Sequence, residues 1–345
     1  MNRVGFLSFG HWQAVPGSRT PTAAAAHLQT IELAEAAEQI GIDGAFVRVH
    51  HFARQLASPF PLMAAIAART SRIEIGTAVI DMRYENPLYM AEEAAAADLI
   101  SGGRLQLGIS RGSPEPALRG AEAFGYSLED GDGEVARAKT ELFLAAIAGA
   151  GVARSDPAMT GSSAMLAIEP QSPGLRERIW WGSGTRETAP FAAEQGMNLM
   201  SSTLLIEDTG VPFDELQAEQ IALYREAWAQ AGWDREPRIS VSRSVLPITS
   251  DIDRLYFGNR GEADQVGYLE GTLARFGRSY VGEPDAIADE LSRDAAVREA
   301  DTLLLTVPNQ LGVEYNARLL DTFAREIGPA LGWRPARELA GAGES

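Results

Sequence analysis

The stretch RIEIGTAVIDMRYENPLYMAEEAAAADLISGGRLQLGISRGSP, residues 72–114, carries the pattern that decides the fold. Its segments 72–80 and 104–110 are short apolar runs of the kind that form strands. Residues 88–100 between them are rich in Ala, Glu and Leu at a helical period. A strand, a helix and a second strand in this order are typical of an α/β protein with a parallel sheet.

The same alternation extends in both directions from this stretch, and its eight strands predict a closed (β/α)8 TIM barrel. Thr20 is expected to cap the first helix and Gly41 to end it in a left-handed conformation. The other strands are predicted at 4–9, 44–52, 178–183, 197–202, 238–248 and 302–308, and the other helices near 22–41, 134–149, 186–195, 214–231, 284–295 and 313–327.

Two insertions interrupt the alternation, one after the fourth strand and one after the seventh. Residues 150–176 lack a helical pattern and contain a short alternating run, which indicates an excursion in the form of a hairpin. Residues 249–281 form a connection long enough to be a lid. The tail 338–345 is expected to be frayed, and residues 1–345 are expected to form a single domain.

The composition limits the classes of partner. The 345 residues include 47 acidic and 30 basic side chains, and the net charge of −17 excludes nucleic acid and anionic membrane surfaces as partners. The absence of cysteine excludes disulfides and thiol catalysis and fits a cytoplasmic protein. The first segment is too short and too polar for a signal peptide, and no apolar run approaches the roughly 20 residues of a membrane span.

Barrel enzymes place their sites at the carboxyl ends of the strands, where this sequence has a histidine pair. His50 and His51 end the second strand, and because side chains alternate along a strand, one of the two faces the barrel mouth. Which of them does so stays open, and a structural role for the histidine is the alternative. The spacing of His11 and His27 offers no further metal ligands, so no metal site is predicted.

Small residues and anion-binding groups mark three more strand ends. Gly76, Thr77 and Ala78 are small where a barrel core prefers bulk, which either admits a flat ligand or packs tightly against a helix. Arg111 follows the fourth strand and is suited to a phosphate. After the fifth strand, backbone N–H groups and hydroxyls form an anion cradle or a glycine-rich turn with a capped helix, at Gly182, Ser183, Gly184, Thr185 and Thr188.

Three segments together resemble the bacterial-luciferase-like flavin-dependent oxidoreductases, a family of (β/α)8 barrels. They are GIDGAFVRVHHF (41–52), the long stretch at 72–114 with AFG at 123–125, and WWGSGTRETAPFAAEQG (180–196). The resemblance implies that His50 is a catalytic acid/base near the flavin. It implies a bulge at Ala78 and Val79, often with a non-prolyl cis peptide, that supports the flavin ring. It also implies that Arg111, Thr185 and Thr188 contact the flavin phosphate.

The sequence departs from the family pattern at several positions. Val49 replaces a carboxylate that commonly precedes the histidine pair, and Ser110 replaces the reactive cysteine that luciferase has near the flavin. The charged residues Asp81, Arg83 and Glu85 indicate either a polar substrate or a solvated rim.

The resemblance favours a two-component monooxygenase, which uses reduced FMN from a separate flavin reductase and O2 to oxidise a small organic substrate. The alternative within the family is a hydride-transfer oxidoreductase that uses a deazaflavin, although no basic cluster for the deazaflavin's anionic tail is apparent. An alternative from another class is a flavin-binding protein without catalysis. A homodimer is expected, and the Ala-rich segment 90–100 lies either at the subunit interface or against its own barrel.

Overall fold

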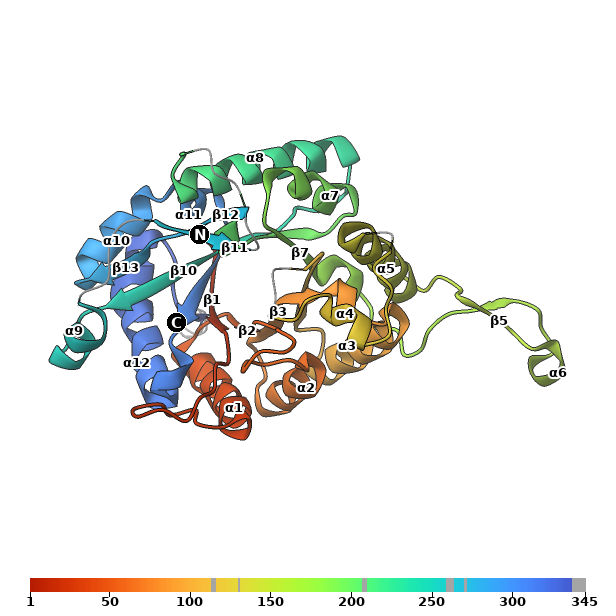
Figure 1. The fold of residues 1–345 in the computed structure, drawn as a ribbon, viewed down its shortest axis with the longest axis horizontal. Coiled ribbons are helices and arrows are strands. Elements are labelled where there is room, and N and C mark those ends of the chain that lie inside the picture. Colours follow the sequence, from red (N-terminus) through yellow and green to blue (C-terminus); the bar gives the residue numbers. More distant parts are fainter. Residues whose placement is uncertain (113–115, 130, 207–209, 259–263, 270–271, 337–345) are drawn as a thin grey trace, which may run out of the picture.

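The computed structural model describes residues 1–112, 116–129, 131–206, 210–258, 264–269 and 272–336. Within these residues, eight parallel strands pair in a ring, and β10 and β14 close it against β8 and β1 (Figure 1). The predicted (β/α)8 barrel is therefore confirmed. In order around the ring the strands are β1 (Arg3–Ser8), β2 (Gly44–Val47), β3 (Glu74–Asp81), β4 (Leu105–Ser110), β7 (Ile179–Ser183), β8 (Asn198–Ser201), β10 (Ile239–Pro247) and β14 (Thr302–Val307).

Helices surround this barrel, and most begin within two residues of their predicted positions (Figure 1). The prediction missed α2 (Pro59–Arg69), which starts with proline in its first turn. The other main helices are α1 (Ala23–Ile40), α3 (Pro87–Ser101), α5 (Asp132–Ile147), α7 (Ala189–Glu194), α8 (Phe213–Ala231), α10 (Pro284–Arg293), α11 (Ala295–Glu299) and α12 (Val313–Thr322). Among the described residues, none of the helices has the length and apolar character needed to cross a membrane.

The ends of α1 correct one prediction and confirm another. Thr22, not Thr20, is the cap, because its hydroxyl accepts a hydrogen bond from the Ala25 N–H at 3.2 Å. The Thr20 hydroxyl instead donates to the carbonyl of His11 at 2.8 Å. Gly41 ends the helix at a φ of 103°, the left-handed conformation that favours glycine.

Both insertions form structure of their own. The first carries a hairpin of β5 (Ala153–Arg154) and β6 (Met165–Leu166) with α6 (Pro157–Thr160) at its end, as the sequence predicted. The second carries α9 (Asp251–Phe257), the antiparallel pair β11 (Gln265–Leu269) and β12 (Thr272–Phe276), and β13 (Ser279–Gly282), which pairs in parallel with the end of β10. The tail 338–345 lies outside the described residues.

The barrel interior is filled in layers below its open end. Leu7, Phe46, Trp180, Met200 and Leu304, one from each of five strands, form an apolar cluster inside the ring. Because these side chains are buried, they make a solid floor for anything that binds at the carboxyl ends of the strands.

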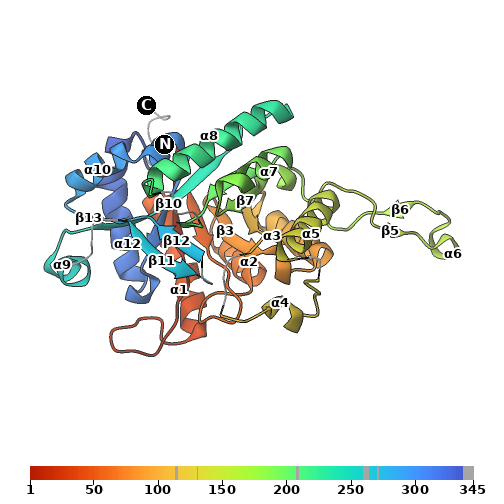
Figure 2. The same ribbon diagram turned by 45° about the horizontal axis from the view of Figure 1, so that its top comes forward.

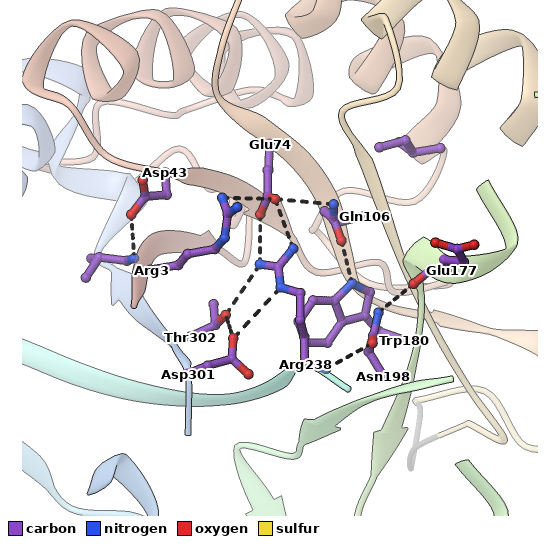
Figure 3. A network of polar contacts seen from close by, with 12 residues as sticks. Arg3, Asp43, Glu74, Gln106, Glu177, Trp180, Asn198, Arg238, Asp301 and Thr302 are labelled. Carbon is purple, nitrogen blue, oxygen red and sulfur yellow. Dashed lines mark hydrogen bonds and ion pairs between the residues drawn. The ribbon is translucent and has the colours of Figure 1, made fainter. Parts of the chain in front are cut away.

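A polar network closes the amino end of the barrel (Figure 3). Glu74 at the start of β3 accepts two hydrogen bonds from Arg238, at 2.9 and 3.0 Å. Arg3 lies 3.2 Å from the same carboxylate. Gln106 accepts a hydrogen bond from the Trp180 indole at 2.8 Å, which joins the network to the apolar cluster above it. Since the amino end is sealed in this way, the carboxyl end is where a ligand can enter.

Candidate active site

A cavity that is partly open to solvent lies at the carboxyl ends of the barrel strands. The lining comes from the ends of seven barrel strands and from the segment after β8, and it includes Leu7, Phe9, Arg48, Val49, His50, Ala78, Val79, Asp81, Ser110, Gly112, Gly182, Gly184, Met200, Ser201, Leu204, Ile206 and Ser242.

The floor of the cavity contains a bulge in β3. The pairing of β3 with β4 shifts register between Thr77 and Ile80, and the peptide bond between Ala78 and Val79 is cis. A Cβ on Gly182 would lie 2.9 Å from Val79 Cγ1, so glycine at this position gives the bulge its room. Gly108 has the same role on β4, since its Cβ would lie 2.3 Å from the Thr77 carbonyl oxygen. The bulge expected at Ala78 and Val79 is therefore present.

Gly76 and Thr77 do not line the cavity, contrary to the expectation of a ligand at these positions. A Cβ on Gly76 would lie 2.5 Å from the Phe46 ring and 2.4 Å from the Gln106 carbonyl oxygen. The Thr77 hydroxyl is fully buried and donates to the Gly108 carbonyl at 2.8 Å. Small residues are needed here because Phe46 fills the inside of the barrel. The predicted alternative was tight packing against a helix, but the residues next to Gly76 are Phe46 and Gln106 of the barrel itself.

The two histidines at the end of β2 have different surroundings. His50 lines the cavity, and its backbone N–H donates to the Leu56 carbonyl at 2.9 Å. The His51 ring stacks on Tyr84, with ring centroids 4.1 Å apart, and meets the edge of Phe124. His50 is therefore the histidine that faces the cavity, which answers the question that the sequence left open.

A second group at the mouth was not predicted as part of the site. Phe9, just after β1, stacks on His11 at 5.7 Å, and the Arg48 guanidinium lies 4.9 Å from the Phe9 ring centre. Burial lowers the pKa of His11, and the charges of Arg48 and His50 lower it further. From the sequence, His11 was not expected to take part in the site. In the described part of the chain, no three acidic or histidine side chains gather so as to hold a metal ion.

The loop after β7 divides into a buried half and an accessible half. Ser183 and Thr188 are buried, and their hydroxyls lie 2.5 Å apart. Gln220 of α8 holds the loop by donating to the Thr185 carbonyl at 2.8 Å. Gly184 lies at the cavity, and a Cβ on it would meet nothing within 4 Å. Ser183 and Thr188 therefore shape the loop, while Gly184 and Thr185 remain half-exposed.

The accessible half of this loop already holds an anion, the carboxylate of Glu187. The Glu187 backbone N–H and the Thr185 hydroxyl both bind it and lower its pKa. The charges of Arg186 and Arg111 lower that pKa further. The sequence prediction of an anion cradle did not anticipate that Glu187, an exposed residue of the loop itself, binds there. Arg111 itself is exposed.

Polar residues at the ends of β3 and β4 bind other groups of the protein. The Ser110 hydroxyl, buried at the end of β4, accepts a hydrogen bond from the Gly112 N–H at 3.1 Å. Arg83 lies 2.7 Å from Asp81 and 2.6 Å from Asp132. Burial lowers the pKa of Arg83, but the hydrogen bonds and charges of these two carboxylates outweigh it and raise the pKa. Asp81 and Arg83 thus pair with each other. The sequence had predicted either contact with a polar substrate or a solvated rim, and neither describes this pair.

Comparison with known proteins settles the family. A family model described as luciferase-like monooxygenase matches residues 3–253. The chain belongs to this family. Its members and structural neighbours are oxidoreductases, so the chain is an enzyme of that class.

The luciferase-like chain is similar to the oxygenase component of a flavin-dependent trigonelline monooxygenase from Acinetobacter baylyi, with 24% identity over 280 residues, 75% of this chain and 74% of the relative. The chain matches several other curated relatives over 23% to 54% of their own length. One is a 4-hydroxyprotoasukamycin monooxygenase from Streptomyces nodosus, 39% identical over 85 residues, 24% of this chain and 23% of the relative.

Solved structures of the same fold include monooxygenase RslO1 from Streptomyces bottropensis, with a TM-score of 0.74, 22% identity and coverage of 95% of this chain and 99% of the other. The oxygenating constituent of 3,6-diketocamphane monooxygenase from Pseudomonas putida, in complex with FMN, has a TM-score of 0.70 and 15% identity, covering 95% and 98%. A coenzyme F420-dependent reductase from Methanopyrus kandleri has a TM-score of 0.62 and 14% identity, with coverage of 95% and 98%. These identities establish a shared fold for the luciferase-like chain and leave its cofactor open.

Proposed function

We propose that the chain is the oxygenase component of a two-component monooxygenase that uses reduced FMN and O2 to oxidise a small organic substrate. A separate flavin reductase supplies the reduced FMN. The observation that carries this proposal is the position of His50 and the Ala78–Val79 bulge in one cavity, next to a loop that holds an anion beside Arg111.

The residues of the cavity fit a flavin. Leu7, Phe9 and Met200 give it apolar walls, and the bulge at Ala78 and Val79 provides a surface for a flat ring. The anion cradle suits a phosphate, because the Thr185 hydroxyl, a backbone N–H and the Arg111 charge already act on one carboxylate. We assign the phosphate to Arg111, Thr185 and Gly184, and the ring to Ala78, Val79, Ser110 and Gly182. Ser183 and Thr188 would support the phosphate loop from behind.

Reduced FMN, when bound, would supply the two electrons that let O2 place one oxygen atom in the substrate and the other in water. His50 would hold and move a proton at its imidazole, since histidine exchanges protons near neutral pH. The apolar walls would keep bulk water from the ring.

The long insertion after β10 is attached to the wall of the cavity. Its strand β12 pairs with β9 (Leu204–Leu205), and Leu204 lines the cavity. We infer that the insertion at 249–281 is a lid whose attachment at β9 links its movement to the cavity wall.

A deazaflavin-dependent hydride transfer is the second candidate, because F420-dependent enzymes share the fold. One of them, a glucose-6-phosphate dehydrogenase from Amycolatopsis mediterranei, is 34% identical over 100 residues, 27% of this chain and 30% of the relative. This candidate needs the same barrel but no reaction with oxygen.

Anaerobic calorimetric titration with reduced FMN and with a reduced deazaflavin tests the proposal. We expect FMN to bind and Arg111→Gln to weaken its binding by about tenfold or more, because a charge-assisted hydrogen bond is lost. Reduced riboflavin, which lacks the phosphate, should bind both forms equally. Arg298→Gln, an exposed arginine on α11 outside the cavity lining, is the matched control. Preference for the deazaflavin would favour hydride transfer, and binding of neither would contradict both candidates.

A further inference from the structure

We propose that a second cavity, next to the one that His50 lines, binds the organic substrate and selects an uncharged aromatic molecule. This inference rests on the proposed function, because it names the substrate class of that same site. The second cavity lies over the ends of β10 and β14. We call it the aromatic cavity after four of its lining residues, Phe9, His11, Tyr256 and Phe257.

The aromatic cavity adjoins the proposed flavin site. Phe9 lines both cavities. On β10, Ser242 lines the first cavity and Ser244 lines the aromatic cavity. Because side chains two residues apart lie on the same face of a strand, both serines face the inside of the barrel mouth. A molecule in the aromatic cavity would therefore lie beside the cavity in which we place the flavin ring.

One wall of the aromatic cavity is formed by α9, which lies beside α12 in both views (Figures 1 and 2). The ring of Tyr315 on α12 contacts those of Tyr256 and Phe257, with centroids 5.9 and 6.3 Å apart. The Tyr315 hydroxyl donates to Asp253 of α9 at 2.6 Å, and Asp253 is buried. The protein itself thus holds the two rings in place, so a ligand need not order them on binding.

A second wall comes from the segment after β1, which is fixed to the end of β14. The His11 N–H donates to the Asn309 side chain at 3.1 Å, and the Asn309 side chain donates to the His11 carbonyl at 2.8 Å. The His11 ring stacks on Phe9, with centroids 5.7 Å apart and 7° between the ring planes. Aromatic pairs from two separate segments therefore belong to one lining. Since aromatic rings pack favourably on other rings, edge-on or offset, this lining favours a flat aromatic ligand.

The lining of the aromatic cavity is uncharged. Among the described residues that line it, none is Asp, Glu, Lys or Arg, although 22% of the whole chain is charged. Burial lowers the pKa of His11, and the charges of Arg48 and His50 lower it further, so its ring is neutral at pH 7. An ion that left water for this cavity would lose its hydration without meeting an opposite charge in the lining. The cavity therefore favours an uncharged molecule over a carboxylate or an ammonium ion.

Neutral polar residues narrow the class further. Ser244, Thr306 and Gln310 belong to the same lining. Hydroxyl and amide side chains donate and accept hydrogen bonds without carrying charge. A few such groups in an apolar cavity fix the orientation of a ligand through its polar atoms. The ligand class that fits all of these residues is an aromatic molecule with a hydroxyl or carbonyl group.

Calorimetric titration of the flavin-free chain with 2-naphthol, its saturated analogue decahydro-2-naphthol and the anion 2-naphthoate tests the proposal. We expect 2-naphthol to bind, and the saturated analogue to bind about threefold to tenfold more weakly because ring contacts are lost. 2-Naphthoate should bind at least about tenfold more weakly, because its charge must be desolvated. No binding of 2-naphthol, or equal or tighter binding of either comparison probe, would overturn the proposal. The titrations contain no flavin, so their outcome is independent of whether FMN binds.

A blocking variant tests where the probe binds. Ser244→Phe adds a ring to the lining, so the affinity for 2-naphthol should fall at least about tenfold. Ser292→Phe, at an exposed position of α10, is the matched control and should leave the affinity unchanged. Urea unfolding of both variants shows that they are folded. Unchanged affinity in a folded Ser244→Phe would overturn the proposal, because 2-naphthol would then bind elsewhere.

A second variant changes the charge of the lining without filling it. Gln310→Lys places a cation there, so 2-naphthoate should bind about threefold to tenfold more tightly than it binds the wild type. Gln230→Lys, at an exposed position of α8, adds the same charge away from the cavity and should change nothing. Equal affinity of Gln310→Lys and the wild type for 2-naphthoate would contradict selection by the uncharged lining.

Discussion

His50 and His51 are adjacent in the chain, yet His50 lines the cavity while the His51 ring stacks on Tyr84, with ring centroids 4.1 Å apart. Two histidines at one strand end therefore have different surroundings, and their contributions to activity and to stability can be separated. We propose that His50 acts on a bound substrate, whereas the stacking of His51 on Tyr84 holds the segment that carries this tyrosine.

Replacing each histidine by alanine should separate these contributions. His50→Ala is expected to lower turnover by about 10² to 10⁴, the usual range for losing a general acid or base, with reduced FMN binding changed only a few-fold. His51→Ala is expected to lower the free energy of unfolding by about 1 to 3 kcal/mol, because a buried stacked ring is removed. Steady-state kinetics, FMN titration and urea unfolding of both variants check this. Unchanged turnover in His50→Ala would remove His50 from the mechanism.

Glu187 should compete with the phosphate of FMN. Its carboxylate is bound by the Thr185 hydroxyl and by its own backbone N–H, close enough to Arg111 for that charge to lower its pKa. Glu187→Gln removes a negative charge from this position, so the affinity for reduced FMN should rise by about threefold to tenfold, as expected for a charge contact near 1 kcal/mol. Calorimetric titration measures it.

The matched control is Glu194→Gln at the end of α7, which removes the same charge from the helix that follows the loop. Riboflavin, without the phosphate, should bind Glu187→Gln and the wild type alike. If riboflavin gained as much affinity as FMN, the effect would not come from the phosphate, and the assignment of the cradle would be wrong.

The barrel could be predicted from the sequence because each of its strands is a local apolar run between helical segments. The bulge at Ala78 and Val79 and the cavity position of His50 also followed from local pattern and resemblance. The strand pattern of the sequence could not show which distant residue fills the space next to a small residue. Gly76 is small because Phe46 occupies the barrel beside it, and a strand pattern does not identify that neighbour.

Contacts between distant segments account for the other misses. The carboxylate in the anion cradle comes from Glu187, which reads in sequence as an ordinary residue of a helix first turn. Asp132, which pairs with Arg83 at 2.6 Å, is 49 residues away. α2 was missed because PFPLMAAIAAR begins with two prolines in three residues, a composition that disfavours helix except in its first turn.

The polar network at the amino end of the barrel should depend on Arg238. It binds Glu74 through two hydrogen bonds, and both side chains are largely buried (Figure 3). Arg238→Met removes two hydrogen bonds and a positive charge from the Glu74 carboxylate. The free energy of unfolding should therefore fall by about 2 to 4 kcal/mol. Arg225→Met, which breaks an exposed ion pair with Glu299, should cost less than about 1 kcal/mol. Equal losses in urea unfolding would contradict a special role for the polar network at the amino end.

Glu85 should make stability depend on pH near neutrality. Burial raises its pKa to about 7, and the charge of Glu93 adds to this while Lys139 opposes it. Because the folded pKa lies above the unfolded value, the folded state holds the proton more tightly. The resulting stability is fully present below pH 4.5, the unfolded value, and is lost as the pH rises through about 7.

Glu85→Gln removes this dependence, because its side chain stays neutral. Relative to wild type, the variant should therefore be more stable at pH 8, by about 1 to 2 kcal/mol once partial exposure and Lys139 are allowed for, and nearly equal at pH 5. Glu141→Gln, at an exposed position of α5, should show no such difference between the two pH values. Urea unfolding of the three proteins at both pH values measures it. A Glu85→Gln effect of the same size at pH 5 would mean that the substitution acts through packing rather than through the proton.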